Sequence, residues 1–376
     1  MTKLIDLCDI QYGYAFDSNC FSKDNSYPQL ARIRDVKRGY SETFYTGKYP
    51  KEYVLSAGDL LIGMDGEFNV ARWKIDGALL NQRVCKVVAK NGTNEEYIRF
   101  FLLKQLKTIE EKTSFVTVKH LSAREINKIE VDIPKLCEQE KIATTLLILE
   151  RIEELRNREL LLLDELVRGR FVELFGDPLD GTAKYPIHQV GDVANSVDPQ
   201  PSHRTPPEEE GGIPYVSIKD CNCKTGKIDF DGARKVSRTI LEEHLNRYTL
   251  HEGDFVIGKI GTIGNPVFVP ARDDYTLSAN VVLIQPNSEL VSPYFLKYSF
   301  ESDFVKKQFA KAKNSTSQAA FGIQKIRTVE VMNPDLEIQS RFADFVKQID
   351  KSKLIVQKEL DETQLLFDSL MQEYFG

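Results

Sequence analysis

The chain has 376 residues, of which 41% are hydrophobic, and its 50 basic and 56 acidic side chains give a net charge of −6. This composition is typical of a globular protein, and at about 100–200 residues per domain it predicts two or three domains. No uncharged apolar run reaches the roughly 18 residues of a membrane span, and the first residues lack the basic and apolar regions of a signal peptide. We therefore expect a cytoplasmic protein that does not contact a membrane.

Six cysteines are scattered along the chain without the spacing of a disulfide framework. Because the chain shows no export signal, we expect them to be reduced thiols. Cys221 and Cys223 form a C-x-C pair, but no second pair of cysteines or histidines supplies the other two ligands of a tetrahedral zinc site. The sequence therefore predicts no bound metal.

Residues 1–136 are predicted to form the first globular domain. Short runs rich in β-branched and aromatic residues, such as Arg83–Val88, are punctuated by Gly, Asn and Pro. This pattern is typical of short strands joined by turns. A short helix is expected at about residues 95–108, so the domain is predicted to have an α+β fold.

Residues 137–176 are predicted to form one long helix. From Glu138 to about Leu174 there is no proline and one glycine, and apolar residues recur mostly every three or four positions. Pro134 stands just ahead of this run, where proline is tolerated. About 36 residues at 1.5 Å each give a helix of roughly 54 Å, which is longer than one domain needs for its own core. The apolar stripe of this helix therefore requires a partner.

The second half of the chain repeats this plan, with a globular domain at 177–336 and a long helix at 337–376. The segment Ser56–Gly66 aligns with His251–Gly261 at an offset of 195 and shares five identical residues. From Ile126 onward the offset is a constant 200. Loops tolerate insertions, whereas a helix that pairs with another helix loses its register when one residue is added. The constant offset therefore indicates that the two long helices are paired.

We predict an α+β protein in which two similar globular domains are separated by two long antiparallel helices. These helices would form a coiled coil, with approximate two-fold symmetry relating the halves of the chain. The residues expected to pack the helices together or against a partner are Ile142, Leu149, Leu163, Leu166, Phe342, Phe345, Ile349 and Leu370.

The sequence holds no recognisable catalytic motif of the nucleotide-binding, hydrolase or metalloprotease kind. The segment Gly258–Gly264 has the wrong glycine spacing for a phosphate-binding loop and is interpreted as a turn between strands. The segment Asn333–Leu336 resembles the catalytic motif of adenine methyltransferases, but it lacks the second proline and the aromatic residue. We therefore predict no catalytic residue and no cofactor in this chain.

Cations cluster at matching places in the two copies, although the chain as a whole is acidic. Residues 1–137 carry 21 basic and 18 acidic side chains, whereas residues 177–336 carry 18 and 21. Neutralising phosphates supplies most non-specific affinity for DNA, so the net charge argues against DNA binding and the local clusters argue for it. Taken singly, each cluster is better explained as a solvated face, and only the recurrence of the clusters in both copies makes DNA binding an equal alternative. The candidate DNA-binding residues are Arg32, Arg34, Lys37, Arg38, Lys119, Lys219, Lys224, Lys227, Lys311, Lys313, Asn314 and Gln318.

The order of these motifs resembles the specificity subunit of a type I restriction–modification system. Each globular unit carries a Gly-Asp-hydrophobic turn, at Asp59 and Asp254, and then a helix entrance that runs from proline to glutamine, at Pro134–Gln139 and Pro334–Gln339. Each long helix closes on Phe-Gly. The resemblance covers essentially the whole chain.

The resemblance implies that the globular units are target recognition domains, each of which reads one half of a split, asymmetric sequence on double-stranded DNA. It also implies that the long helices hold two methyltransferase subunits, which bind S-adenosylmethionine. Cleavage would be carried out by separate restriction subunits. The chain departs from the pattern in two ways: Ile338 stands where the first copy has Glu138, and the second domain is net acidic.

Two other functions remain open at this point. The first is a DNA adenine methyltransferase with a fused recognition domain, although we find no cofactor-binding pattern. The second is a coiled-coil scaffold whose globular ends bind protein rather than DNA, which the negative charge favours.

Overall fold

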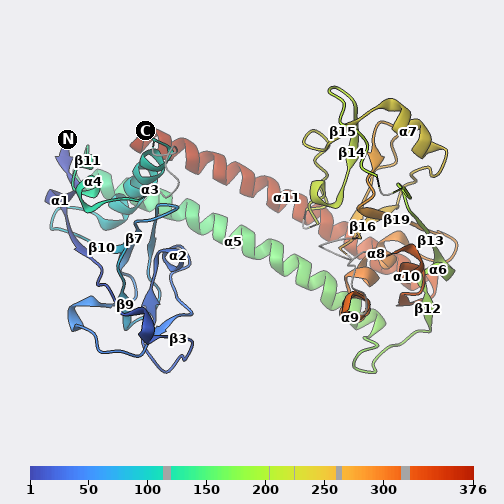
Figure 1. The fold of residues 1–376 in the computed structure, drawn as a ribbon, viewed down its shortest axis with the longest axis horizontal. Helices are drawn as coiled ribbons and strands as arrows, with labels where there is room; N and C mark the ends of the chain where they lie inside the picture. Colours follow the sequence, from blue (N-terminus) through green and yellow to red (C-terminus); the bar gives the residue numbers. More distant parts are fainter. Residues whose placement is uncertain (113–119, 203, 224, 260–264, 315–321) are drawn as a thin grey trace. The chain divides into compact units, whose positions relative to one another are not determined.

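The computed structural model describes all residues except 113–119, 203, 224, 260–264 and 315–321, together with the side chains of 312–314. The chain divides into two compact units, of which unit 1 comprises residues 1–157 and 358–376 and unit 2 comprises residues 158–357. Each unit therefore contains one globular domain and half of each long helix, as Figure 1 shows by its colours. The first half of α5 and the second half of α11 thus pack with the first globular domain, and the other two halves pack with the second.

Unit 1 is built on a four-stranded antiparallel sheet in the order β2-β10-β7-β8. A three-stranded sheet, β4-β9-β6, pairs β4 and β9 in parallel, and β1-β11 and β3-β5 form two further pairs. The strands are β1 Thr2–Lys3, β2 Cys8–Tyr12, β3 Phe21–Ser22, β4 Leu30–Ala31, β5 Phe44–Tyr45, β6 Val54–Leu55, β7 Leu60–Gly63, β8 Asn69–Arg72, β9 Ala78–Leu80, β10 Val84–Ala89 and β11 Glu130–Val131. The helices are α1 Leu4–Leu7, α2 Ile33–Val36, α3 Glu95–Lys112 and α4 Ala123–Ile126, with 3₁₀ turns at Ser18–Cys20 and Lys51–Tyr53.

Unit 2 has a four-stranded antiparallel sheet in the order β13-β19-β16-β17. Its three-stranded sheet, β15-β14-β18, pairs β14 and β18 in parallel, and β12 pairs with β20. The strands are β12 Ile187–Gln189, β13 Ala194–Val197, β14 Ile213–Val216, β15 Lys235–Val236, β16 Phe255–Gly258, β17 Val267–Phe268, β18 Thr276–Leu277, β19 Val281–Pro286 and β20 Glu330–Met332. The helices are α6 Val190–Val193, α7 Arg238–Leu245, α8 Pro293–Glu301, α9 Asp303–Asn314 and α10 Ile323–Arg327, with a 3₁₀ turn at Ile218–Asp220.

The strand pairings confirm the duplication that the sequence predicts. The order β2-β10-β7-β8 in unit 1 corresponds to β13-β19-β16-β17 in unit 2. The parallel pairing of Leu30 with Leu79 likewise recurs as the pairing of Tyr215 with Thr276. Because each unit combines a four-stranded antiparallel sheet with helices packed on one of its faces, each unit has the predicted α+β fold.

The four-stranded sheet is the middle layer of each unit. In β7, Leu60 and Ile62 belong to the core formed with α3, whereas Leu61 belongs to the core around Trp73 on the other face. The strand β16 divides in the same way between the two cores of unit 2. In Figure 1, α8 and α10 lie on one side of β16 and β19, and β14, β15 and α7 lie on the other. Burial on both faces explains why these strands are continuous hydrophobic runs without alternation.

The long helices α5 and α11 run over Leu136–Phe175 and Leu336–Phe375, which is 40 residues each. The sequence placed their last residues at Gly176 and Gly376. Gly176 instead lies just past the helix with a φ of +78°, which a residue with a Cβ adopts only with strain. It is the left-handed residue that ends many helices, and its N–H donates to the Val172 carbonyl 2.7 Å away.

The two long helices run antiparallel within each unit. In unit 1, Leu146 near the start of α5 shares a core with Phe375 at the end of α11. In unit 2 the roles are exchanged, and the rings of Phe171 near the end of α5 and Phe342 near the start of α11 lie 5.5 Å apart. Ion pairs between the helices join Arg156 to Glu359 at 2.5 Å and Asp164 to Lys353 at 2.6 Å.

The duplication predicts that a circular permutant folds. Both chain ends lie in unit 1 (Figure 1). The first strand of that unit, β1, pairs with β11, and β12 pairs with β20 in the same way in unit 2. In unit 2, the loop 177–186 joins the end of α5 to β12. A copy of this loop between Gly376 and Met1 should therefore close unit 1, with new ends at Asp180 and Gly181. We expect the permutant to melt within a few degrees of the parent and to keep its binding specificity, as measured by circular dichroism and DNA selection.

A permutant with a two-residue linker is the matched control, and it should melt at a lower temperature because it lacks the main-chain bond that Lys184 of this loop makes to the Phe175 carbonyl. The prediction is contradicted if the ten-residue permutant fails to fold.

Candidate nucleic-acid interface

A surface cleft of about 630 Å³ lies in unit 1. It is lined by α2 and the residues on either side of it, by the β7–β8 loop and by the β9–β10 turn. Three of the predicted DNA-binding residues, Arg32, Arg34 and Lys37, line this cleft. The strand β4 ends at Ala31, and these cations flank or belong to the single helical turn α2 that follows it.

Asp35 fixes the positions of two of the predicted cations. Its fully buried carboxylate accepts a hydrogen bond from Arg32 Nε at 3.1 Å, another from Ser41 Oγ at 2.8 Å, and a third from Arg38. Burial alone raises the pKa of Asp35, but the hydrogen bonds from the two arginines and Ser41 outweigh it and hold the pKa below its usual value. An ionised carboxylate therefore holds Arg32 at the cleft and also fixes Arg38, which is not among the residues that line it.

Of the predicted cations that line the cleft, Arg34 and Lys37 are exposed. Lys37 Nζ lies 3.4 Å from Glu67, but both side chains are about 70% exposed, so this ion pair is weak. Arg34 forms no ion pair with the residues that the structure describes. Both side chains are free to meet a phosphate.

The structure adds residues to the cleft that sequence reasoning missed. Arg83, between β9 and β10, has its Nη1 2.9 Å from His120 Nδ1 and 3.4 Å from Asp65 Oδ1. His120 Nδ1 also lies against the same carboxylate, to which it can only donate, so Asp65 is the acceptor that Arg83 and His120 share. The amides of Asn81 and Gln82 line the cleft beside them. The duplication gave no signal for Arg83, because the equivalent residue of unit 2 is an asparagine. The Arg83 carbonyl accepts from the Met64 N–H, and in unit 2 the Asn280 carbonyl accepts from the Lys259 N–H in the same way.

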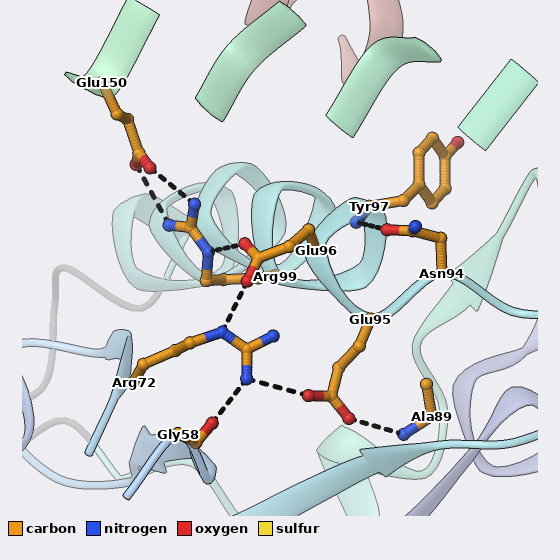
Figure 2. Close-up of polar contacts among 9 residues, drawn as sticks. All are labelled: Gly58, Arg72, Ala89, Asn94, Glu95, Glu96, Tyr97, Arg99 and Glu150. Atoms are coloured by element: carbon orange, nitrogen blue, oxygen red, sulfur yellow. Dashed lines mark hydrogen bonds and ion pairs between the residues drawn. The ribbon is translucent and has the colours of Figure 1, made fainter. Parts of the chain in front are cut away.

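A second group of charges holds the cleft's sheet to the long helix (Figure 2). Arg99 of α3 donates two hydrogen bonds to Glu150 of α5, at 3.0 and 2.6 Å, and one to Glu96 at 2.5 Å. Arg72 at the end of β8 bonds to Glu96 at 2.5 Å and to Glu95 at 2.9 Å. Burial favours the neutral form of Glu96, but the two arginines outweigh it and keep the pKa of Glu96 below its usual value. Because the first residue of β8 lines the cleft, this network positions the cleft relative to the first half of α5.

The predicted cations of unit 2 lie on two elements. Lys219 belongs to the 3₁₀ turn Ile218–Asp220, at the place that Arg34 occupies in unit 1, and is exposed. Lys227 is exposed on the hairpin that follows, where its carbonyl accepts from the Asn222 N–H at 2.8 Å. Lys311 is exposed on α9. These positions support no stronger statement about DNA contact, so their role stays a prediction.

Five predicted DNA-binding residues fall outside what the structure describes. Lys119, Lys224 and Gln318 belong to the segments left out, and the side chains of Lys313 and Asn314 are left out although their backbone lies in α9. Their proposed contacts with DNA remain predictions.

The predicted helix-packing residues divide by burial. Ile142 and Leu370 pack against the core of unit 1, and Phe342, Phe345 and Ile349 belong to or pack against the core of unit 2. In α5, Leu149 is buried and Leu163 is half-buried, whereas Leu166 is 49% exposed. The residue of α5 that reaches the core at this point is Val167, whereas Leu166 lines a surface pocket together with Phe345 of α11.

A buried histidine marks the inner side of α7 in unit 2. His244 is 1% exposed, with its Nδ1 2.5 Å from Thr276 Oγ1 and its Nε2 beside Gln200 Oε1. Burial, and secondarily the charge of Arg247, lower the pKa of His244 from 6.5 to about 4. The ring is therefore neutral in the folded protein at pH 7 and serves as a structural polar group.

We expect unit 2 to lose stability as the pH falls from about 6.5 to about 4. Over this range the unfolded chain takes up a proton on His244 and the folded chain does not, so stability rises with pH. The loss should be on the order of 2–3 kcal/mol by pH 4, from the free energy of a pKa shift of this size. Guanidinium unfolding at pH 7 and pH 4.5 would measure it. The variant His244→Gln should flatten this pH dependence, whereas His188→Gln, at an exposed position, should leave it unchanged. An equally steep dependence in His244→Gln would contradict the assignment.

Within the described ranges, no group of three or more His, Cys, Asp or Glu side chains is arranged to hold a metal ion. In that same part of the chain, no helix is both long and apolar enough to cross a membrane.

The two units repeat one α+β plan, and the cleft of unit 1 gathers four basic side chains. The model of the type I restriction modification DNA specificity domain matches residues 1–163 and 184–364, and the chain belongs to this family. It is the specificity subunit of a type I restriction–modification system, which supplies recognition of the DNA target rather than catalysis. Specificity subunits of type I systems act with DNA and with the other subunits of the system.

Two curated relatives resemble the chain over most of its length. The specificity subunit of the type I restriction enzyme EcoBI from Escherichia coli is 26% identical over 390 residues, which cover 97% of this chain and 82% of the relative. The MjaVIII specificity subunit from Methanocaldococcus jannaschii is 22% identical over 330 residues, covering 84% of this chain and 77% of the relative.

Solved structures share the fold. The type I restriction–modification S subunit from M. genitalium aligns with a TM-score of 0.60 and 14% identity, covering 100% of this chain and 95% of the other. A chain from a structure that describes complex assembly and conformational transition of a type I system aligns with a TM-score of 0.54 and 16% identity, covering 100% and 96%.

Proposed function

We propose that this chain recognises a bipartite, asymmetric site on double-stranded DNA, with one half of the site read by each unit. The cationic cleft of unit 1 is the observation that carries this proposal. Exposed cations recur at equivalent places, Arg34 in unit 1 and Lys219 in unit 2, where they suit phosphates. The surrounding residues differ between the units, as Arg83 and Asn280 do, so the two half-sites should differ in sequence.

The proposal includes two copies of a methyltransferase subunit, each bound to the long helices. In α5 and α11, apolar residues stay exposed at positions that the duplication makes equivalent: Leu155 matches Ile355 and Leu166 matches Leu366, with exposed fractions of 47–60%. Unit 1 therefore carries Leu155 of α5 and Leu366 of α11, and unit 2 carries the equivalent residues Leu166 and Ile355. Equivalent apolar surfaces on two units suit two copies of one partner.

The catalytic chemistry is assigned to the partners. S-adenosylmethionine would be bound by the methyltransferase subunits, which flip an adenine out of the duplex, and restriction subunits would cleave. This chain would select the site at which those reactions occur. We propose no cofactor within the chain itself.

Selection from random-sequence DNA with the reconstituted complex tests this function. We expect enrichment of two different short motifs at a fixed distance. Enrichment of a single continuous motif would overturn the two-reader proposal. Enrichment of no sequence at all would favour a scaffold that binds protein, the function that the net charge of −6 left open.

Equilibrium dialysis of the purified chain with S-adenosylmethionine tests where the cofactor binds. We expect no binding by this chain alone and binding by the complex. Stoichiometric binding by the chain alone would favour the alternative of a fused methyltransferase.

A further inference from the structure

Arg83 adopts a backbone conformation that arginine normally avoids. Its φ is +68°, and among the described residues it is the one non-glycine residue with a positive φ. Such a conformation costs an L-residue on the order of 1 kcal/mol. A glycine would avoid this cost, and ten of the glycines in the chain do have positive φ. An arginine at this position therefore points to a role for its side chain.

The side chain of Arg83 is held from one edge. Nη1 contacts His120 and Asp65, while Nε and Nη2 have no partner in the described part of the chain. The side chain is 50% exposed, so its unpaired edge faces solvent at the cleft. A guanidinium that is oriented by a carboxylate and keeps two free N–H groups can donate a pair of parallel hydrogen bonds.

The cleft beside Arg83 contains a second sign of a missing ligand. Asn81 is only 8% exposed, and its Oδ1 is buried without a hydrogen-bond partner among the described residues. The Oδ1 of Asn69 in the same cleft is also buried and unpaired within that part of the chain. Buried polar atoms are rarely left unpaired in a native protein, so such atoms indicate that another molecule completes their hydrogen bonds.

Resting on the function proposed above, we propose that Arg83 is the residue of unit 1 that determines specificity, and that it reads a guanine in the major groove. Guanine presents O6 and N7 as two adjacent acceptors, which match the free edge of a guanidinium. Arg34 and Lys37, exposed at the same cleft, would contact neighbouring phosphates, which contribute affinity but no sequence information. His120 and Asp65 are then positioning residues that hold the Arg83 side chain.

The variant Arg83→Gly separates a DNA contact from a structural role. Because glycine accepts a positive φ without strain, the variant should fold with an unchanged or raised melting temperature, monitored by the fluorescence of Trp73 in the same unit. We expect the reconstituted complex with this variant to lose discrimination at one guanine of the unit 1 half-site by about 5- to 150-fold, which is the range for one bidentate contact. The unit 2 half-site should be read as before.

Duplex DNA carrying 7-deazaguanine at that position supplies a matched probe, since it removes only the N7 acceptor. The modification should weaken binding of the parent complex and leave binding of Arg83→Gly unchanged. Lys37→Gln is the control for a phosphate contact, and it should weaken binding to all sequences alike and reduce the salt slope by about one.

Two results would overturn the inference alone: a half-site for unit 1 that keeps its guanine preference in Arg83→Gly, or an equal effect of 7-deazaguanine on parent and variant. If the parent complex selects no two-part site, the proposed function itself fails. The selection with the parent complex therefore distinguishes the two failures.

Discussion

Duplicating residues 153–156 in α5 together with residues 359–362 in α11 should lengthen the DNA gap between the two half-sites by about two base pairs. Four helical residues add about 6 Å, and DNA rises 3.4 Å per base pair. The ion pair of Arg156 with Glu359 shows which residues of the two helices face each other at this point. The recognised bases in each half should be unchanged, because neither insertion lies in a globular domain.

Selection from random-sequence DNA with the parent and the insertion variant measures this gap. Binding of the variant to the parent site should fall by at least about tenfold, since misplacing one half-site loses more than a single mismatched base pair. A variant with only the α5 insertion is the matched control, and it should lose stability because the register between α5 and α11 is broken. An unchanged gap in the double insertion would remove the spacer role from the helices.

Replacing either of two buried glutamines by alanine should destabilise the unit that contains it by about 2–4 kcal/mol, which is the range for losing two hydrogen bonds and leaving their partners buried. Gln139 accepts a hydrogen bond from the Asn94 N–H and donates one to the Pro134 carbonyl, both at 2.8 Å. Gln339 makes the equivalent bonds, to the Ser292 N–H at 2.6 Å and from its own amide to the Pro334 carbonyl at 2.7 Å.

The two variants act on different units, which makes them controls for each other. The single tryptophan, Trp73, lies in unit 1, so its fluorescence should report an earlier transition in Gln139→Ala. In Gln339→Ala, the loss should appear in calorimetry of the whole chain as an earlier transition of unit 2. Gln348→Ala, at an exposed position of α11, should have little effect on either signal. If both alanine variants lower the free energy of unfolding by less than about 0.5 kcal/mol, water replaces the hydrogen bonds of the two glutamines. A loss that small is typical of substitutions at exposed positions.

The sequence predicted the duplication and the long helices well because both leave local, repeated signals. The constant offset of 200 residues and the absence of proline each reflect a paired helix. Periodicity alone could not fix the rotation of α5 about its axis. Leu166 and Val167 are neighbours with similar hydrophobicity, yet only Val167 is buried, together with Phe171 and Phe175 at intervals of four residues.

The cleft was predicted only in part, because its residues are far apart in the sequence. Arg32, Arg34 and Lys37 stand close together and gave a visible cluster. Arg83 and His120 meet only when the β9–β10 turn and the region before α4 fold against one another, 37 residues apart. The charge network of Arg72 and Glu150 depends equally on packing between β8, α3 and α5 (Figure 2).

The attachment of each domain to its long helix has an evolutionary consequence. The oxygen of Gln139 and that of Gln339 each bind a main-chain N–H, and their amides each bind a main-chain carbonyl. Any domain that begins a helix where α3 and α8 begin offers a free main-chain N–H to this glutamine, whatever side chains the domain carries. Recombination that exchanges a whole reader between related genes would therefore preserve the joint, so new target sites can arise by shuffling intact modules.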